Sequence, residues 1–395
     1  MSVYLDYAAT TPLEPAVLEA MLPLLRGEAA NPSSVHGPGR RARVRLEEAR
    51  ERVAAVLGCA PAEIVFTSGG TEADNLALRG VLGARAAEGR TGLVASAAEH
   101  DAVRRTAEAL AEAGADVRLL PPATHGALTA DLVAEEADAR TALVSAMYVN
   151  NETGVVTDLP ALAEAARRAG ALLHTDAVQA PGLLPLRVDD LGVDLLALSA
   201  HKFGGPVGVG VLYVRQGTPL APVLTGGAQE RRRRGGTENV AGAVGLAEAL
   251  ARAEDARAET APRLAALRDR LAAQVAALVP AGGVRFNTPL EGYACAPHAC
   301  APHILNVSFP PPGAAPLDGE MLLLGLDLEG VQVSAGSACT SGALEPSHVL
   351  RALGVPRETA QATVRFSLGR PTTEADVEAA AAALGRVLQR LGALG

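Results

Sequence analysis

One side chain in this chain of 395 residues offers a chemistry that the sequence otherwise avoids. Lys202 is the only lysine, and the other 34 of the 35 basic residues are arginines. Arginine can replace lysine wherever only a positive charge is needed. Its guanidinium does not deprotonate usefully, however, so it cannot supply the neutral amine that attacks a carbonyl. We therefore interpret Lys202 as a lysine that forms a Schiff base, and not as a surface lysine left by chance.

The residues around Lys202 place it at the end of a strand. The apolar run 195–198 before it is suited to a buried strand, and residues 209–214 predict a second one after it. Ser199 and His201 flank the lysine with a hydroxyl and an imidazole, both able to bind an oxyanion. Loops at the ends of buried strands are where α/β folds place their chemistry.

A second segment offers a site for a phosphate group. Residues 64–67 predict a strand, and residues 68–72, SGGTE, predict a tight turn that opens a helix. Such a helix start binds phosphate through its backbone N–H groups and its positive dipole end, where Gly70 stands and where Thr71 adds a hydroxyl. A glycine-rich turn alone is weak evidence. Taken together with Lys202, the turn predicts the phosphate-binding site of an aldehyde cofactor that carries a phosphate, namely pyridoxal 5′-phosphate.

The larger, first part of the chain alternates apolar strands with helical patterns. This is the βαβ rhythm of a mainly parallel sheet with right-handed crossovers, in which functional residues gather at the C-terminal ends of the strands. A long helix is expected over about residues 41–57, before the first of the main strands. The expected strands are 64–67, 92–96, 116–120, 141–148, 171–175, 194–199 and 209–214.

Polar residues follow four of these strands. They lie at 99–100, 150–154, 176–179 and 201–202. Any one group could consist of ordinary turn residues. Four such groups, all at strand ends and one of them with the single lysine, make it much less convincing that all are ordinary turn residues.

Pyridoxal phosphate chemistry provides a role for each group. Asp176 is suited to pair with the pyridine nitrogen, which keeps it protonated and makes the ring an electron sink. His100 is suited to stack on the ring and to move protons. Either Gln179 or Asn151 could hydrogen-bond the phenolic oxygen. The side chains suited to hold the phosphate are Thr71, Ser199 and His201.

The last third of the chain predicts a second, smaller unit. Residues 240–278 have the periodicity of a long alanine-rich helix, which we expect to connect the two units. The strands and helices expected after it form an α+β arrangement with its own core. The strands lie near 284–287, 304–309 and 363–368, and the helices near 317–326, 347–353 and 373–391.

Two side chains in this smaller unit are candidates for chemistry. Cys339 lies in residues 332–344, QVSAGSACTSGAL, whose small side chains cannot pack a core and can move. An exposed, reactive thiol is therefore one reading, and an inert lone cysteine is the other. Arg365 lies inside an apolar strand. A buried arginine needs an anion, and a substrate carboxylate bound through two hydrogen bonds is a good candidate.

Two further patterns have no clear role. Residues 295–303 read CAPHACAPH and contain Cys295, His298, Cys300 and His303. Their spacing could bind a metal, but a local duplication in a loop is the preferred interpretation, and no metal is predicted. Residues 231–234 are four consecutive arginines. We expect them in an anion-proximal or interface loop.

Composition excludes several classes of protein. The net charge of −9 argues against nucleic acid as the main partner. No apolar run is long enough to span a bilayer, and no secretory signal precedes the first structured residues. Four cysteines do not make a disulfide framework. We expect a cytoplasmic α/β protein that does not bind membranes.

Nine segments together resemble the cysteine desulfurases of the NifS/IscS type, which are class V of the fold-type-I pyridoxal-phosphate enzymes. The set is highly specific because it spans nearly the whole chain in order. The cysteine loop, followed by LEPSHVLRALG, resembles the branch with a long mobile loop and not the SufS-like branch. The segments are YLDYAATTP (4–12), NPSSVHGPGR (31–40), FTSGGTEADNLAL (66–78), YVNNETGV (148–155), HTDAVQAPG (174–182), LSAHKFGGPVGVG (198–210), GGAQERRRRGGTENV (226–240), VSAGSACTSG (333–342) and VRFSLGR (364–370).

The resemblance implies a fold-type-I pyridoxal-phosphate-dependent transferase of the α/β class. Its large domain, residues 12–258, would bind the cofactor on a mostly parallel seven-stranded sheet. The smaller α+β domain, residues 1–11 and 259–395, would carry the catalytic cysteine loop. A homodimer is also implied.

The resemblance further implies the reaction and its residues. Cys339 would attack the sulfur of cofactor-bound L-cysteine, leaving L-alanine and a persulfide that serves iron–sulfur cluster assembly or tRNA thiolation through an acceptor protein. Lys202 would carry the cofactor and His100 would stack on its ring. Asp176 would pair with the pyridine nitrogen and Gln179 with the phenolic oxygen. The phosphate would be held by Gly70, Thr71, Ser199, His201 and, from the partner subunit, the residue equivalent to Thr237, while Asn151 and Arg365 would position the substrate.

Three departures from the family pattern stand out. Val207 replaces a usual lysine, the arginine run 231–234 is denser than usual, and residues 295–303 form an insert. The alternatives are a selenocysteine lyase or another class V lyase or aminotransferase, a catalytically silent sulfur-trafficking partner, and a metal-binding module. The thiol of Cys339 argues against an aminotransferase, and the intact set of catalytic side chains argues against a silent partner.

Overall fold

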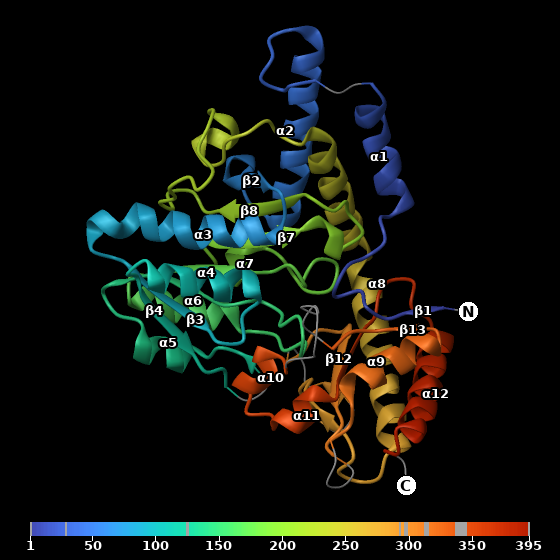
Figure 1. Cartoon of the computed structure of the whole chain (residues 1–395). Coiled ribbons are helices and arrows are strands. Elements are labelled where there is room, and N and C mark those ends of the chain that lie inside the picture. Colours follow the sequence, from blue (N-terminus) through green and yellow to red (C-terminus); the bar gives the residue numbers. More distant parts are fainter. Residues whose placement is uncertain are drawn as a thin grey trace.

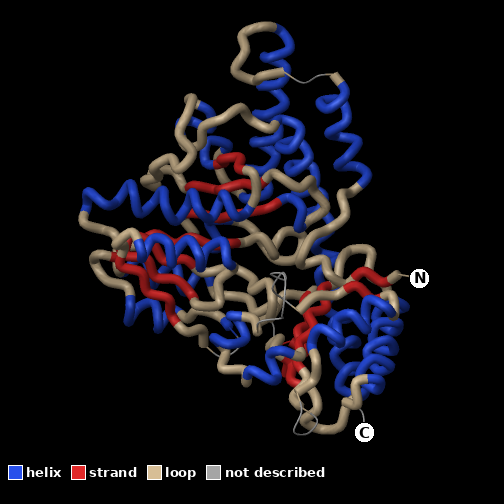
Figure 2. The backbone as a smooth tube through the Cα atoms, in the orientation of Figure 1, coloured by secondary structure: helices blue, strands red, loops and turns tan. Residues whose placement is uncertain are grey.

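The computed structural model describes residues 2–27, 30–123, 126–291, 294–295, 299–311, 316–335 and 346–393. Its helices and strands form two units, a larger one that contains the central sheet and a smaller one that carries both ends of the chain (Figure 1). In the larger unit, helices flank a seven-stranded sheet, and in the smaller unit they pack beside a three-stranded sheet (Figure 2). The predicted α/β class with an α+β appendage is confirmed.

The seven-stranded sheet is parallel except for one strand. Its order is β2-β8-β7-β6-β5-β3-β4, and β8 runs antiparallel to both of its neighbours. The carboxyl ends of the six other strands therefore meet at one edge, where α/β folds hold their ligands. The bounds are β2 Ile64–Thr67, β3 Gly92–Ser96, β4 Asp116–Leu120, β5 Thr141–Ser145, β6 Leu172–Asp176, β7 Leu195–Ser199 and β8 Gly210–Val214.

Each face of this sheet has its own apolar core. Along β7, Leu195 and Ala197 belong to one core, whereas Leu196 and Leu198 belong to the other. Successive side chains of a strand point to opposite faces, and both faces here are covered by helices. This is why the strands read as continuous apolar runs in the sequence. Complete burial of one such leucine contributes about 1.5–3 kcal/mol.

Two predicted elements have different limits in the structure. The strand expected over 141–148 ends at Ser145, because Met147 N–H donates to the side chain of Glu99, at 2.9 Å from its Oε1, and not to a strand. The N–H groups of Ala146 and Tyr148 still donate to backbone oxygens of β6, at 3.1 and 2.8 Å. The helix expected over 41–57 begins at Gly37, because His36 caps it by accepting a hydrogen bond from Gly39 N–H.

One long helix joins the two units, as predicted. Helix α8, Val240–Leu278, contributes Leu246 and Leu250 to a core of the large unit and Leu264 and Leu271 to the core of the small unit. A predicted domain boundary at residue 258 falls inside this helix and stays a prediction. None of the helices in the described ranges combines the length and apolarity needed to cross a bilayer.

The small unit begins with the N-terminal strand. Strand β1, Val3–Tyr4, pairs parallel with β13, Val331–Gln332. The three-stranded sheet has the order β14-β12-β9, with β9 at Arg285–Phe286, β12 at Ile304–Ser308 and β14 at Thr363–Ser367. Strand β10, Leu290–Glu291, pairs antiparallel with β11, Ala294–Cys295.

The remaining helices complete the two units. Helices of the large unit are α1 Pro15–Arg26, α2 Gly37–Leu57, α3 Gly70–Arg85, α4 Asp101–Glu112, α5 Ala130–Glu136, α6 Leu159–Arg168 and α7 Val188–Leu191. Helices of the small unit are α9 Gly319–Leu328, α10 His348–Ala352, α11 Arg357–Gln361 and α12 Glu374–Arg390. Short 3₁₀ turns include η4 at Ala200–Lys202 and η5 at Gln229–Arg232.

Candidate active site

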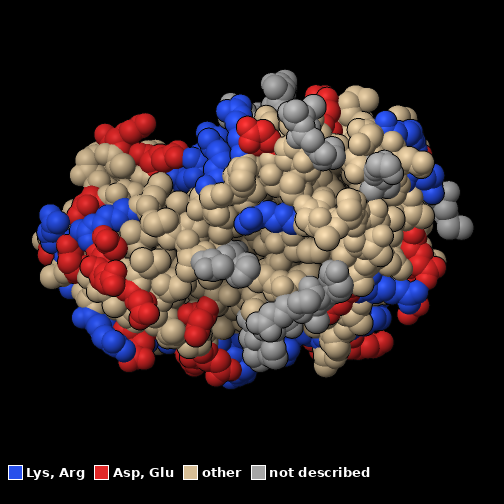
Figure 3. Space-filling view, turned by 90° about the horizontal axis from the view of Figure 1, so that it is seen from below, with Lys and Arg blue, Asp and Glu red and all other residues tan. Residues whose placement is uncertain are grey.

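A cavity of about 370 Å³ opens at the carboxyl edge of the large sheet, against the small unit. It brings together residues that lie up to 359 positions apart in the sequence, from Asp6 to Arg365. In the view from below, basic side chains lie in a hollow near the middle of this face, and most acidic side chains lie toward its periphery (Figure 3). The predicted site residues in its wall are Gly70, Thr71, His100, Asn151, Asp176, Gln179, Ser199, His201, Lys202 and Arg365.

Lys202 ends the turn η4 directly after β7. Its Nζ donates hydrogen bonds to the backbone oxygens of Ala8 at 2.7 Å and Ala9 at 3.0 Å. Burial lowers its pKa to about 8, and the positive charge of Arg365 acts in the same direction. At pH 7 about one molecule in ten then carries the neutral amine, whereas an ordinary lysine has about one in 2,500. This supports the interpretation of Lys202 as a nucleophilic amine.

The start of helix α3 forms one end of the cavity. Gly70 is the first residue of α3, and a Cβ there would lie 2.9 Å from Val178 Cγ2, so a larger residue at this position would have to displace Val178. Ser199 and His201 bring a hydroxyl and an imidazole from the end of β7 to the same wall. Burial lowers the pKa of His201 to about 4, with Lys202 contributing, so the ring is neutral and one nitrogen donates. This end has the donors that a phosphate needs.

Asp176 and Gln179 lie on the wall beside the end of β6. Asp176 is buried and its Oδ1 accepts a hydrogen bond from Val178 N–H at 2.9 Å. Burial raises its pKa, while His100, the Val178 bond and Lys202 oppose the shift. Gln179 Nε2 donates to Ala8 O at 2.9 Å. The two side chains lie where one carboxylate and one amide can contact a single flat ring.

His100 is fixed by the helix that it starts. Its Nδ1 accepts a hydrogen bond from Ala102 N–H at 3.1 Å, which caps α4. Because Nδ1 accepts, the exchangeable proton of the neutral ring belongs to Nε2. Helix capping thus sets both the orientation and the tautomer of a predicted proton-transfer group.

Arg365 lies on β14 and is 3% exposed. Its guanidinium donates to Asn151 O at 2.8 Å and to Asp6 Oδ1 at 2.9 Å. The anion that a buried arginine requires is thus provided in part by Asp6, which the sequence reasoning did not single out. The only signal was its place in the segment YLDYAATTP. Asn151 Oδ1 is buried and accepts no hydrogen bond within the described ranges, as expected of a group that awaits a ligand.

Cys339 lies outside the described residues, as do all of residues 336–345. The residues on either side of this segment are described. Ser334 lines the cavity and its carbonyl accepts from Arg365 N–H at 2.7 Å. Ser347 donates to Glu152 Oε2 at 2.5 Å. Of these two flanking residues, Ser334 lies in the cavity wall, and Ser347 is bonded to Glu152, the chain neighbour of the wall residue Asn151.

Thr237 is the one predicted phosphate ligand that does not line this cavity. It is exposed, in the loop that precedes α8. A contact made from a partner subunit is compatible with that position, and the role stays a prediction.

The arginine run lies in the same loop. Arg234 Nε binds Glu72 Oε1 at 2.8 Å, and Glu72 in turn accepts from Ser68 N–H at the start of α3. Glu230, just before the run, is buried and pairs with Arg50 at 2.8 Å. Three non-glycine residues here have positive φ, from 43° at Glu230 to 63° at Arg232. The loop is therefore held in a strained conformation against the phosphate end of the site.

The CAPHACAPH segment is only partly described, and His298 lies outside the described residues. His303 is buried, with Nε2 3.4 Å from Gln179 Oε1, so it contacts a side chain that is predicted to bind the cofactor. Burial lowers the pKa of His303 to about 3, and three nearby positive charges act in the same direction. Among the described residues, no group of three metal-ligating side chains comes together.

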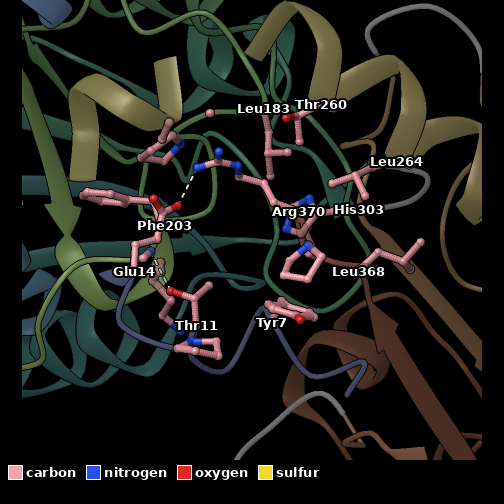
Figure 4. A pocket seen from close by; sticks show the side chains of 18 of the residues that line it. Tyr7, Thr11, Glu14, Leu183, Phe203, Thr260, Leu264, His303, Leu368 and Arg370 are labelled. Carbon is pink, nitrogen blue, oxygen red and sulfur yellow. Dashed lines mark hydrogen bonds and ion pairs between the residues drawn. The ribbon is translucent and has the colours of Figure 1, made fainter. Parts of the chain in front are cut away.

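A second cavity of about 450 Å³ adjoins the first, and Lys202 and Gln179 belong to both walls. It is lined mostly by apolar side chains from both units, including Phe203 and Leu264 (Figure 4). Glu14 crosses its edge and binds Arg370, with Oε1 2.5 Å from Arg370 Nη1. This ion pair ties the large unit to the small unit beside the site.

Comparisons with known proteins agree with this geometry. The aminotransferase class-V family model matches residues 3–380. The chain is 43% identical over 98% of its length to the cysteine desulfurase IscS of Dictyoglomus turgidum, of which it covers 95%. It is 42% identical over 98% of its length to the putative cysteine desulfurase IscS 1 of Bacillus subtilis, of which it covers 99%.

Solved structures agree as well. A structure described as a NifS-like protein matches with a TM-score of 0.89 and 35% identity, covering 99% of this chain and 100% of that one. A structure described as SspA in complex with cysteine matches with a TM-score of 0.78 and 33% identity, covering 93% of this chain and 99% of that one. These descriptions do not favour the alternative of a selenocysteine lyase.

Proposed function

The chain belongs to the class-V aminotransferase family and, within it, to the pyridoxal-phosphate-dependent cysteine desulfurases, and on this premise we propose how its residues divide the reaction. L-cysteine is converted to L-alanine, and the sulfur is collected as a persulfide on Cys339. The observation that carries the proposal is the convergence of ten predicted residues, among them the single lysine of the chain, on one cavity.

The residues of the cavity fit pyridoxal phosphate. The N–H groups that open α3, with Thr71, Ser199 and His201, hold the phosphate. Asp176 pairs with the pyridine nitrogen and Gln179 with the phenolic oxygen. When bound, the cofactor supplies an aldehyde and a ring that accepts electrons from the substrate.

Lys202 is the amine that binds the cofactor aldehyde, and later in the reaction it acts as a proton acceptor. Its pKa of about 8 keeps a useful fraction neutral near pH 7, so it attacks a carbonyl and also accepts a proton near neutral pH. The backbone oxygens of Ala8 and Ala9 orient its Nζ. His100 carries its proton on Nε2 and moves protons at the part of the cavity wall where α4 begins.

Arg365 and Asn151 bind the substrate. The guanidinium of Arg365 takes the substrate carboxylate, and its bonds to Asn151 O and Asp6 Oδ1 prevent it from turning away. The buried Oδ1 of Asn151 accepts from a donor on the bound molecule. Orientation of this kind fixes where the substrate sulfur lies relative to Ser334, the wall residue that comes shortly before residues 336–345 in the chain.

Sulfur transfer occurs at Cys339. Its thiolate attacks the sulfur of L-cysteine, so an S–S bond forms and the Cβ–S bond of the substrate breaks with its electron pair left on carbon. That carbon takes up a proton and becomes the methyl group of alanine. The products are L-alanine and an enzyme persulfide, which a second protein accepts after the loop has moved.

The finer assignments rest on the family. We propose a homodimer in which Thr237 contacts the phosphate of the partner subunit. The persulfide serves iron–sulfur cluster assembly or tRNA thiolation in the cytoplasm, through a scaffold or thiolation protein. Neither direct binding of nucleic acid nor attachment to a membrane is part of the proposal.

The decisive experiment compares the native protein with Cys339→Ala in the presence of L-cysteine and a thiol reductant. Alanine is measured, and the yellow colour of lysine-bound cofactor is recorded in both proteins. The native protein should form alanine, and the variant should keep its cofactor without forming alanine. Equal alanine formation by the variant, or none by the native protein despite bound cofactor, would refute the persulfide mechanism.

A further inference from the structure

Beside Asp176 the cavity wall contains a second buried carboxylate, Asp74, to which the reaction described above gives no role. Asp74 comes from α3 and is 1% exposed. Its Oδ1 lies 3.4 Å from Nε2 of His174, and Nδ1 of His174 lies 2.9 Å from Ser145 Oγ. His174 and Ser145 are fully buried. The three side chains form a polar row behind the cavity wall, from α3 through β6 to β5.

This row stands next to the carboxylate that faces the pyridine nitrogen. His174 and Asp176 are two positions apart on β6, so their side chains point to the same face of the sheet. Asp74 and Asp176 both line the one cavity. Two carboxylates that share a desolvated site cannot both ionise without a large cost, so one of them keeps a proton.

The surroundings decide which of the two carboxylates is protonated. Asp176 receives a hydrogen bond from Val178 N–H and lies near the positive charge of Lys202, and both favour its charged form. Asp74 Oδ1 accepts no hydrogen bond within the described ranges. Burial, then Asp176, then Glu99 raise the pKa of Asp74 well above its ordinary value.

His174 does not supply a compensating positive charge. Burial lowers its pKa to about 3, so the ring is neutral at physiological pH. The 3.4 Å separation of Asp74 Oδ1 and His174 Nε2 is also longer than the 2.7–2.9 Å (roughly) of a charge-assisted hydrogen bond. Both observations favour a neutral pair over an ion pair.

We propose that Asp74 is a positioning residue that stays a neutral carboxylic acid at physiological pH, backed by His174 and Ser145, and that it thereby keeps Asp176 as the ionised partner of the pyridine nitrogen. The second half of this statement rests on the proposed function, because it concerns the cofactor. The protonation state itself concerns only the chain. In this arrangement the Nδ1–H of His174 donates to Ser145 Oγ, and the unprotonated Nε2 faces the acid group of Asp74 across 3.4 Å.

The test uses infrared spectra of the full-length apoprotein labelled with ¹³C at the aspartate carboxyl groups. Asp74→Asn and Asp176→Asn are the two variants, and both preserve side-chain shape. Labelling excludes bands from Glu99 and the other glutamates. Subtracting the Asp74→Asn spectrum from the native one at pH 8 should reveal a carboxylic-acid band, and subtracting the Asp176→Asn spectrum should reveal a carboxylate band. A carboxylate band for Asp74, or an acid band for Asp176, overturns the proposal.

A pH titration separates this role from a merely structural one. If Asp176 carries the charge that keeps Asp74 protonated, the acid band of Asp74 should disappear at a pH lower by about one unit or more in Asp176→Asn than in the native protein. An unchanged midpoint would mean that the two carboxylates are not coupled, and the proposal would fail. Neither readout requires cofactor or turnover. A negative result here therefore differs from a failure of the desulfurase reaction, which the alanine assay reports.

Discussion

Glu152 leads to a prediction whose magnitude follows from the structure. The residue is 1% exposed, and its Oε2 accepts a hydrogen bond from Ser347 Oγ. Burial raises the pKa of Glu152 from 4.5 to about 7, although the Ser347 bond and the charge of Arg365 oppose the shift. Ser347 also caps α10 by accepting from Val349 N–H at 3.0 Å. Glu152, which follows the wall residue Asn151 in the chain, thus holds the residues that come after the predicted cysteine loop.

The raised pKa makes stability depend on pH in a defined direction. Between pH 4.5 and pH 7 the folded state binds more protons at Glu152 than the unfolded state does, so the free energy of unfolding falls as pH rises. The contribution is fully present below pH 4.5 and changes no further well above pH 7. Between pH 5 and pH 8 the loss is about 2–3 kcal/mol, at about 1.4 kcal/mol for each tenfold change in the proton equilibrium.

The perturbation is Glu152→Gln, which keeps the shape and removes the titrating group. Urea unfolding of the apoprotein at pH 5 and pH 8 gives the free energy of unfolding for the native protein, for this variant and for Glu358→Gln, an exposed control on α11. We compare the free energy of unfolding of Glu152→Gln with that of the native protein at each pH. This difference should shift in favour of the variant by about 2–3 kcal/mol from pH 5 to pH 8, because only the native protein loses stability over this range. The control should change by less than about 0.5 kcal/mol.

One result would refute this reasoning. If the difference between Glu152→Gln and the native protein is the same at both pH values within about 0.5 kcal/mol, Glu152 does not titrate in this range in the folded state. The slope of the denaturant dependence must also agree among the three proteins, since a change of slope would signal a loss of two-state unfolding and not a loss of a proton.

Two further predictions concern the site itself. Lys202→Arg keeps the positive charge but removes the nucleophilic amine, so it should abolish covalent retention of the cofactor after borohydride reduction and lower kcat by about 10³-fold or more; normal covalent retention would contradict the assignment. Arg365→Lys loses the planar fork that holds Asn151 O and Asp6 while keeping the charge, so KM for L-cysteine should rise by about 10–100-fold with a smaller change in kcat, as expected for a lost charged hydrogen bond. An unchanged KM would exclude Arg365 from substrate binding.

The sequence was sufficient to predict most of the sheet because each strand is buried on both faces. Such strands read as apolar runs bounded by turns, and all seven main strands were expected within a few residues of their positions. The error at β5 has a physical cause. Residues 146–148 are still buried, so they remain apolar, and the N–H groups of Ala146 and Tyr148 still donate to β6, but Met147 N–H donates to the side chain of Glu99 and not to a strand.

The sequence could not reveal the partners of the site residues. Arg365 was expected to need an anion, but Asp6 was not identified, because the two residues meet only when β1 and β14 pack into the small unit. Asp74 and Glu152 read as ordinary polar residues of a helix and a turn. Their importance comes from burial, which a periodic pattern does not show when a single carboxylate lies among small residues. The segment with Cys339 lies outside the described residues, so its role rests on the sequence and on the relatives.

Residue chemistry was determined by the sequence alone. A single lysine among arginines, a glycine-rich helix start and polar residues after buried strands identify an aldehyde cofactor and its ligands without any coordinates, because these properties belong to side-chain types and to local periodicity. Protonation states and orientations were decided by the tertiary structure. The lowered pKa of Lys202, the fixed tautomer of His100 and the raised pKa of Glu152 all depend on burial and on contacts between distant segments, which the local sequence does not encode.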